Sequence, residues 1–220
     1  DLDETRAPLL DHLIELRTRV VRALLALGIG FAICLYFADD ILGLLVFPLK
    51  QAFPDGQGQL IFTKLPEVFF VELKVALFAG FLISFPVIAN QLWAFIAPGL
   101  YAREKKAFLP FLLATPLLFT AGAALAYFVA MPIALRFLLG YAGNIGGVEL
   151  EALPGIDNYL GFVTKFLFGF GVAFLLPVLL MLLERGGIVT REQLKSGRRY
   201  AIVGAFAIAA ILTPPDVISQ

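Results

Sequence analysis

The sequence is short of the side chains that most enzymes and metal sites require. Its 220 residues include only one cysteine and one histidine. This argues against most metal clusters and against catalytic Cys–His pairs. It also contains no Gly-x-x-x-x-Gly-Lys phosphate loop and no Gly-x-Ser-x-Gly nucleophile motif. Cys34 is expected to be core filler and His12 a packing or surface residue. We therefore predict that the protein is not an enzyme and holds no metal ion or cofactor.

Charged residues are also scarce, at 15% of the chain, whereas 60% is hydrophobic and the mean hydropathy is +0.90. Five long apolar stretches stand out, roughly residues 20–38, 68–96, 108–139, 159–183 and 200–212. A lipid core about 30 Å thick is crossed by about 20 apolar helical residues. Backbone groups inside lipid must bond to one another, which favours helices. The sequence predicts an all-α polytopic membrane protein with a single transmembrane domain over residues 1–220.

Lysine and arginine gather on alternate loops of this predicted protein. They precede or open the first span, separate spans two and three, and separate spans four and five: Arg6, Arg17, Arg19, Arg22, Arg103, Lys105, Lys106, Arg185, Arg191, Lys195, Arg198 and Arg199. The positive-inside rule places the N-terminus and both basic loops in the cytoplasm. The first residues show no Arg- and Ser-rich transit pattern. We therefore expect a multi-pass protein of the prokaryotic cytoplasmic (inner) membrane.

Two segments outside the spans are also predicted. Residues 8–19 are expected to form an amphipathic helix that continues into the first span, with Pro8 in its first turn. Such a helix can lie along the membrane surface before it turns in. Residues 39–67 are expected to cap the outer surface as a short apolar helix with an irregular return. The alternative for this segment is a re-entrant loop.

The predicted spans differ in length. The uncharged parts of the spans at 68–96 and 200–212 measure only about 20 Å at about 1.5 Å per residue, which is shorter than the lipid core. The span at 108–139 exceeds about 40 Å by the same measure. It carries three prolines, Pro110, Pro116 and Pro132, which remove backbone hydrogen bonds and kink helices. This mixture predicts a tilted, concave bundle.

Two acidic residues on the predicted cytoplasmic face have basic neighbours. Glu15 can pair with Arg19 four residues on, an arrangement worth a few tenths of a kcal/mol on a helix surface. Glu104 can be a solvated loop charge between Arg103 and Lys105. Alternatively, the two acids together form a receptor for a cationic partner. The spacing of the residues does not decide between these interpretations.

Four short motifs follow one another along the chain: His12–Arg17 (His-Leu-Ile-Glu-Leu-Arg), Gln91–Lys106, Ala126–Val129 (Ala-Tyr-Phe-Val) and Thr213–Asp216 (Thr-Pro-Pro-Asp). In this order the chain resembles the TatC family, the multi-spanning receptor of the twin-arginine protein translocase. The resemblance extends from about residue 8 to the last residue. It implies six spans with both termini in the cytoplasm, whereas this sequence ends at Gln220, after the fifth predicted span.

The resemblance also implies roles for particular residues. It assigns Glu15 and Glu104 as the acids that receive the paired arginines of a signal peptide, with Arg17 holding local geometry or balancing charge. The remaining positions that it marks, as partner or structural motifs, are Pro48, Tyr127, Thr213, Pro214, Pro215 and Asp216. An arginine fork can bind a carboxylate through two hydrogen bonds, which lysine does not reproduce.

The function implied by the resemblance is export of folded proteins across the membrane, driven by the proton gradient. The implied partners are twin-arginine signal peptides, single-span TatA- and TatB-like proteins, the lipid bilayer and other copies of the chain, with no nucleic acid. A small-solute transporter or channel is the alternative, but it would need polar residues paired midway across several spans, and almost none are present. An intramembrane protease would need a catalytic aspartate pair, which is missing.

One position departs from the family pattern. Many members carry glutamate or glutamine inside the fourth span, just before the proline that stands here at Pro177. This sequence has Leu175 at the position where the polar residue is expected. An intramembrane carboxylate is costly and usually functional. Its absence puts in doubt a polar contact inside the concave face and leaves the cytoplasmic acids unaffected.

Overall fold

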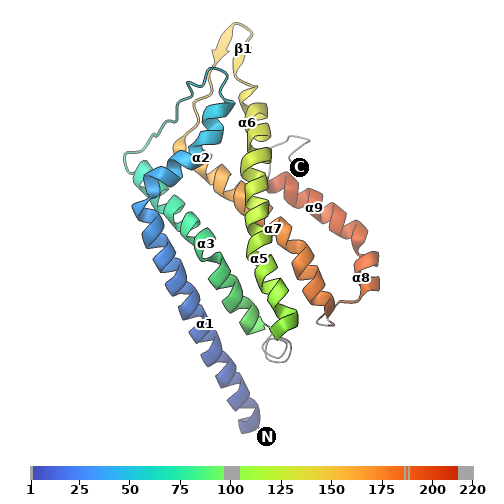
Figure 1. Cartoon of the computed structure of the whole chain (residues 1–220). Helices are drawn as coiled ribbons and strands as arrows, with labels where there is room; N and C mark the ends of the chain where they lie inside the picture. The colour runs from blue at the N-terminus through green and yellow to red at the C-terminus, as the bar shows by residue number, and fades with distance from the viewer. Residues whose placement is uncertain (1, 97–104, 186, 188, 213–220) are drawn as a thin grey trace. The chain divides into compact units, whose positions relative to one another are not determined.

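The computed structural model describes residues 2–96, 105–185, 187 and 189–212 (Figure 1). These residues are mostly helical. In chain order the elements are α1 (Leu2–Tyr36), α2 (Ala38–Ala52), α3 (Glu67–Ile96), α5 (Lys105–Leu125), the π-helix η1 (Ala126–Ala130), α6 (Met131–Leu139), β1 (Gly143–Ile145), β2 (Val148–Leu150), α7 (Ile156–Arg185), α8 (Arg191–Ser196) and α9 (Arg198–Leu212).

Four helical segments in the described part are long and apolar enough to cross a membrane. They cover Pro8–Tyr36, Glu67–Phe95, Pro110–Leu139 and Ile156–Arg185, where the first four spans are predicted. The fifth predicted span corresponds to α9, a helix of 15 residues. At about 1.5 Å per residue, a helix of this length is shorter than the lipid core, as the sequence indicated for this segment.

Contacts between residues divide the chain into two compact units. The first unit comprises the described residues of 1–41 and 72–117, and the second comprises those of 42–71 and 118–220. The prediction of one transmembrane domain over the whole chain, and of a concave bundle, stays a prediction.

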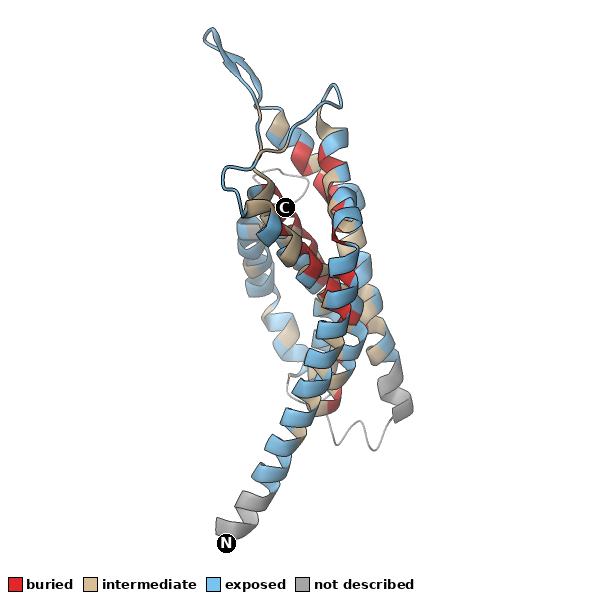
Figure 2. Cartoon of the chain, turned by 90° about the vertical axis from the view of Figure 1, so that its left-hand side faces the viewer, coloured by how far each residue is buried: buried red, intermediate tan, exposed pale blue. Residues whose placement is uncertain are grey.

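The helix α1 is longer than the sequence indicated. The predicted amphipathic segment and the first span form one continuous helix, and it begins at Leu2, so Pro8 lies inside the helix and not in its first turn. The reason is local, since the preceding residues include good helix formers such as Leu2, Glu4 and Ala7. Most of α1 is exposed (Figure 2), including large apolar side chains such as Leu24 and Ile29. An apolar exposed helix of this length is suited to a lipid environment.

In the first unit, α1 and α3 approach each other at two glycines. A Cβ atom added at Gly30 would lie 2.8 Å from the Gly80 carbonyl oxygen, and one added at Gly80 would lie 2.6 Å from the Phe31 nitrogen. Next to this contact, the Ser84 hydroxyl donates a 2.8 Å hydrogen bond to the Ala26 carbonyl oxygen. Small residues let helix backbones come close, which is the usual means of helix association in membranes.

The second unit uses the same device between α5 and α7. A Cβ atom added at Gly122 would lie 2.5 Å from the Phe170 carbonyl oxygen, and one added at Gly171 would lie 2.7 Å from the Phe119 ring. Phe119 is buried and packs edge-on against Phe168 at a centroid distance of 6.2 Å. The two helices are therefore held by close backbone contact together with aromatic packing.

The predicted over-long span is interrupted where η1 separates α5 from α6. Pro132, the second residue after η1, has no N–H to donate to the carbonyl four residues back. Just before it, the N–H of Met131 bonds to the Ala126 carbonyl oxygen five residues back, and not to the carbonyl four residues back as in an α-helix. This is π-helical geometry. The proline therefore does not end the helix, because the backbone takes up one extra residue in this turn, and Tyr127 lies in it.

Residues 39–67, predicted to form a cap, contain all of α2 except its first residue and then a non-helical return, whereas their place on the outer surface stays a prediction. The return is fixed at Ile61, whose N–H bonds to the Pro154 carbonyl and whose carbonyl accepts from the Ile156 N–H, at 3.1 and 2.8 Å. A β-hairpin of β1 and β2, which the sequence analysis did not predict, follows α6 and pairs Ile145 with Val148. Gly146 and Gly147 have φ values of 62° and 90°, as a tight two-residue hairpin turn requires.

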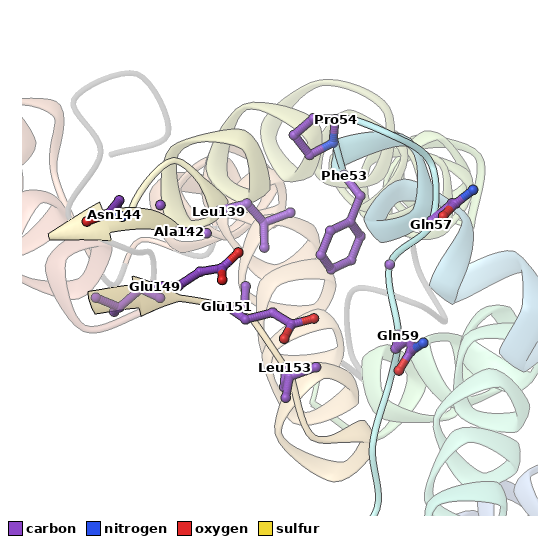
Figure 3. A pocket seen from close by; sticks show the side chains of 14 residues that line it. Phe53, Pro54, Gln57, Gln59, Leu139, Ala142, Asn144, Glu149, Glu151 and Leu153 are labelled. Carbon is purple, nitrogen blue, oxygen red and sulfur yellow. The ribbon is translucent and has the colours of Figure 1, made fainter. Parts of the chain in front are cut away.

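The return segment and the hairpin together line an open pocket of about 660 Å³ (Figure 3). Phe53 and Gln59 contribute from the return segment, and Glu149 and Glu151 contribute from the hairpin strand β2 and the residue just after it. All of these residues belong to the second unit.

Candidate functional site

Glu15 lies on α1 and is paired with Arg19, one helical turn further on. Both Nε and Nη2 of Arg19 donate to the same carboxylate oxygen, Oε1, at 3.3 Å. The side chain of Glu15 is 34% exposed and that of Arg19 is 24% exposed. The i,i+4 pair predicted from the sequence is therefore present, and it is partly removed from solvent.

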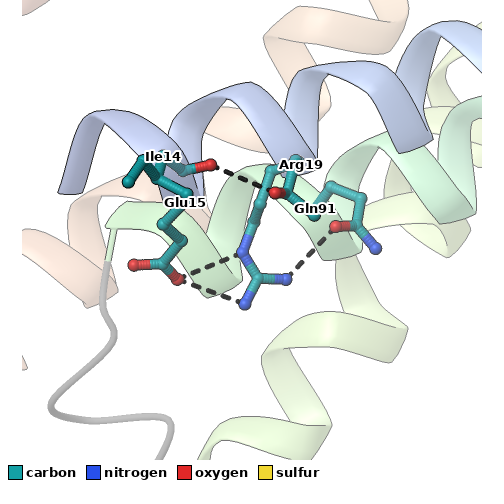
Figure 4. A network of polar contacts seen from close by, with 5 residues as sticks. Ile14, Glu15, Arg19 and Gln91 are labelled. Carbon is teal, nitrogen blue, oxygen red and sulfur yellow. Dashed lines mark hydrogen bonds and ion pairs between the residues drawn. The ribbon is translucent and has the colours of Figure 1, made fainter. Parts of the chain in front are cut away.

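Arg19 also makes a contact that the sequence did not reveal. Its Nη1 donates a 3.2 Å hydrogen bond to Oε1 of Gln91 on α3 (Figure 4). The guanidinium thus lies between a carboxylate on its own helix and an amide on a helix 72 residues away. Gln91 belongs to one of the four sequence motifs, but no role was predicted for it.

A second contact joins the same two helices close by. The rings of His12 and Phe95 stack with centroids 4.5 Å apart and an interplanar angle of 20°. His12 lies one turn before Glu15 on α1, and Phe95 lies one turn after Gln91 on α3. Glu15 is therefore held between two contacts that cross from α1 to α3. His12 acts as a packing residue, as predicted.

The second carboxylate oxygen of Glu15, Oε2, has no hydrogen-bond or ion-pair partner among the described residues. An ionised carboxylate can accept about four hydrogen bonds. Oε2 is consequently an acceptor that the described residues leave unused.

Arg17 is exposed on α1 and makes no side-chain hydrogen bond or ion pair with the described residues. Residues two apart on a helix do not face each other, so Arg17 does not join the cluster of Glu15, Arg19 and Gln91. Its predicted role in balancing charge or holding geometry stays a prediction.

Several predicted site residues lie outside the part of the chain that the structure describes. They are Glu104, Thr213, Pro214, Pro215 and Asp216. The predicted cooperation of Glu15 with Glu104 therefore stays a prediction.

Pro48 and Tyr127, which the resemblance marked separately, are connected in the second unit. Pro48 is buried in α2 and cannot donate to the Leu44 carbonyl, its partner four residues back. The Tyr127 hydroxyl takes that place, donating a 2.5 Å hydrogen bond to the Leu44 oxygen. The tyrosine thus supplies the hydrogen bond that the proline cannot, at a residue of α2 that is itself exposed.

Tyr159 on α7 makes a similar contact and was missed by the sequence analysis. Its hydroxyl donates a 2.7 Å hydrogen bond to the Leu45 carbonyl oxygen, and its side chain is buried. Two tyrosines from different helices thus bond to adjacent carbonyls of α2. A tyrosine at the start of an apolar run was the only available signal, and it is a weak one.

Two further observations limit the chemistry of the described residues. No three histidine, cysteine, aspartate or glutamate side chains in this part of the chain come together in a group that could hold a metal ion. Leu175, the position where the family often has a polar residue, is half-buried in α7.

Comparisons with known proteins agree with the resemblance read from the sequence. A family model described as Sec-independent protein translocase protein (TatC) matches residues 11–220. The chain is 44% identical over 217 residues to the Sec-independent protein translocase protein TatC of Magnetococcus marinus, covering 99% of this chain and 78% of that protein. To the protein of the same name from Escherichia coli it is 42% identical over 217 residues, covering 99% and 82%.

The fold is similar to that of a twin-arginine translocase receptor, TatC, in a crystal structure determined in DDM. The TM-score is 0.81 at 43% sequence identity, and the match covers 95% of this chain and 91% of that one. The predicted fold class, an all-α polytopic membrane protein, is confirmed by this likeness and by the long apolar helices. The chain therefore belongs to the TatC family of Sec-independent protein translocase proteins.

Proposed function

We propose that this protein is a receptor for twin-arginine signal peptides and the core subunit of a translocase that exports folded proteins using the proton gradient. The observation that carries the proposal is the state of Glu15. Its carboxylate is partly desolvated, is held between two contacts across α1 and α3, and keeps one oxygen available. The name of the similar crystal structure, a twin-arginine translocase receptor, supports this assignment.

A guanidinium is the cation that fits such a carboxylate best. It is planar and presents several N–H donors in a fixed fork, whereas an ammonium is a compact and strongly hydrated point charge. A fully exposed ion pair contributes only about 0 to 1 kcal/mol, so one such pair would discriminate poorly. We propose that Glu15 and Glu104 each receive one arginine of the pair, with Arg17 nearby balancing charge.

The protein is proposed to act without enzymatic chemistry, in the prokaryotic cytoplasmic (inner) membrane with its N-terminus in the cytoplasm. The support is the distribution of lysine and arginine along the sequence. TatA- and TatB-like single-span proteins, and further copies of this chain, are the proposed partners. Exposed apolar side chains on the membrane helices leave area for such helices as well as for lipid.

The proposal is tested by measuring binding or crosslinking of a twin-arginine peptide to purified variants. Glu15→Gln and Glu104→Gln should each weaken binding by about 1 to 3 kcal/mol, since each removes a charge-assisted hydrogen bond. Glu15→Lys and Glu104→Lys should weaken it further through repulsion. The effects should not add simply if both acids contact one peptide.

Asp11→Asn provides a matched control, because Asp11 is an exposed acid one turn before Glu15 on the same helix. It should bind the peptide like the wild type. Undiminished binding by a protein carrying both Glu15→Lys and Glu104→Lys would refute the receptor assignment.

A further inference from the structure

The carboxylate of Glu15 already has a guanidinium beside it when no peptide is bound. Arg19 supplies the same chemical group that the proposed ligand would bring. It uses two of its nitrogens, and both bond to a single oxygen of Glu15. The free protein therefore contains an internal mimic of half of the proposed twin-arginine ligand.

The geometry of this internal pair is weak for its type. Charge-assisted hydrogen bonds from nitrogen to carboxylate oxygen are usually about 2.7 to 2.9 Å long, and the strong arrangement has two parallel bonds to two oxygens. Here both distances are 3.3 Å and only one oxygen is used. An incoming guanidinium that bonds to both oxygens would make the better pair.

Arg19 also has a second acceptor within reach. Its Nη1 already bonds to Oε1 of Gln91 at 3.2 Å, and Figure 4 shows the guanidinium lying between the carboxylate and this amide. If Arg19 leaves Glu15, one of its hydrogen bonds can remain. Displacement therefore does not leave its charge without a partner, which would be costly in a partly buried position.

We propose that Arg19 is an internal competitor that occupies Glu15 in the free receptor and is displaced toward Gln91 by an incoming guanidinium. This inference rests on the proposed function, since it assumes that Glu15 receives the arginine of the peptide. An ammonium loses a strongly held hydration shell and cannot form the parallel two-bond pair. It therefore recovers less than a guanidinium does on replacing Arg19.

The test compares binding of two peptides that differ only in carrying Arg-Arg or Lys-Lys. Arg19→Gln leaves Glu15 without its internal partner, so the Arg-Arg peptide should bind about tenfold more tightly than to the wild type. The affinity of the Lys-Lys peptide should rise by no more than the same factor, because an ammonium makes the weaker pair with Glu15 and the cost of displacing Arg19 is removed for both peptides. Arg22→Gln is the matched control, because Arg22 is an exposed arginine on the same helix, and it should leave both affinities close to those of the wild type.

A second variant tests the same idea with Arg19 in place. Gln91→Glu keeps the size of the side chain but offers Arg19 a carboxylate, which should draw the guanidinium away from Glu15. The Arg-Arg peptide should bind more tightly, as in Arg19→Gln. Asn90→Asp, which adds the same charge at the exposed neighbouring position, controls for general attraction of cationic peptides and should raise the affinity much less than Gln91→Glu does.

The possible results separate the two proposals. If Arg19→Gln weakens the Arg-Arg peptide as much as Glu15→Gln does, Arg19 is a positioning residue and the displacement proposal is wrong. It is equally wrong if Arg19→Gln and Gln91→Glu both bind the Arg-Arg peptide with the wild-type affinity, or if only the Lys-Lys peptide gains affinity. If Glu15→Gln itself binds the Arg-Arg peptide normally in the same assay, the receptor role of Glu15 fails. Tighter binding of the Arg-Arg peptide by both variants, with neither control matching the gain, supports the displacement proposal.

Discussion

The two units of the molecule use polar side chains in different ways. In the first unit, Arg19 bonds to Glu15 and Gln91 through distances of 3.2 to 3.3 Å, side chain to side chain, and the groups are partly exposed. In the second unit, the hydroxyls of Tyr127 and Tyr159 bond to backbone carbonyls of α2 at 2.5 and 2.7 Å. The first arrangement joins side chains that can exchange partners, whereas the second attaches two hydroxyls to backbone atoms of one helix.

The difference does not come from helix packing, because both units are held by close glycine contacts. Gly30 and Gly80 bring α1 to α3, and Gly122 and Gly171 bring α5 to α7. What distinguishes the Arg19 cluster from the two tyrosines is therefore where their hydrogen bonds end. A bond that ends on a backbone carbonyl stabilises the fold, and a bond between half-exposed side chains leaves an acceptor for a ligand.

The largest effect is expected at the shared packing device. Gly80→Leu places a side chain within 2.6 Å of the Phe31 nitrogen, a backbone atom that cannot move aside. We expect a loss of about 3 kcal/mol or more in the free energy of unfolding, at the upper end of overpacking costs. Thermal unfolding in detergent measures this loss.

Gly28→Leu is the control for this substitution, because a Cβ atom at Gly28 meets nothing within 4 Å. It should unfold near the wild-type temperature. Equal unfolding temperatures for the two variants would show that the α1–α3 glycine contact does not hold the first unit.

A smaller effect is expected at the buried hydroxyl of the second unit. Tyr159→Phe removes the donor to the Leu45 carbonyl and should cost about 1 to 2 kcal/mol in the free energy of unfolding. Peptide binding by the folded fraction should not change. Tyr141→Phe, at a tyrosine that is 65% exposed, should leave the unfolding temperature unchanged, and a matching drop there would contradict the assignment.

The smallest effect is expected in the coupling between Pro48 and Tyr127. Pro48→Ala restores an N–H that can bond to the Leu44 carbonyl, so Tyr127→Phe should cost less in that background than alone. We expect a coupling of about 0.5 to 1 kcal/mol in a double-mutant cycle of unfolding free energies. Simple additivity of the two substitutions would show that the tyrosine does not compensate for the proline.

The sequence predicted those parts of the molecule that depend on local pattern. Long apolar runs gave the positions of the membrane helices, and i,i+4 spacing gave the pair of Glu15 and Arg19. The hairpin could have been found in the same way, because Gly146 and Gly147 form a typical two-residue turn. The start of α1 was wrong because a proline was taken to mark the first turn of a helix that begins at Leu2.

The remaining features depend on contacts between distant parts of the chain. Nothing in the local sequence connects Arg19 to Gln91, or Tyr159 to the Leu45 carbonyl 114 residues earlier. Pro132 indicates a lost hydrogen bond, but not that the backbone responds with a π-helical turn at Ala126. Such pairings are set by the packing of whole helices, which periodicity along one helix does not encode.

The difference between the two units is tested most directly by measuring peptide binding and thermal unfolding on the same preparations of Glu15→Gln and Tyr159→Phe. Glu15→Gln should weaken binding of the Arg-Arg peptide by about 1 to 3 kcal/mol with an unfolding temperature close to that of the wild type. Tyr159→Phe should lower the unfolding temperature and bind the peptide normally. If Glu15→Gln instead destabilises the fold and leaves binding by the folded protein unchanged, Glu15 is a structural residue and the proposed receptor site is contradicted.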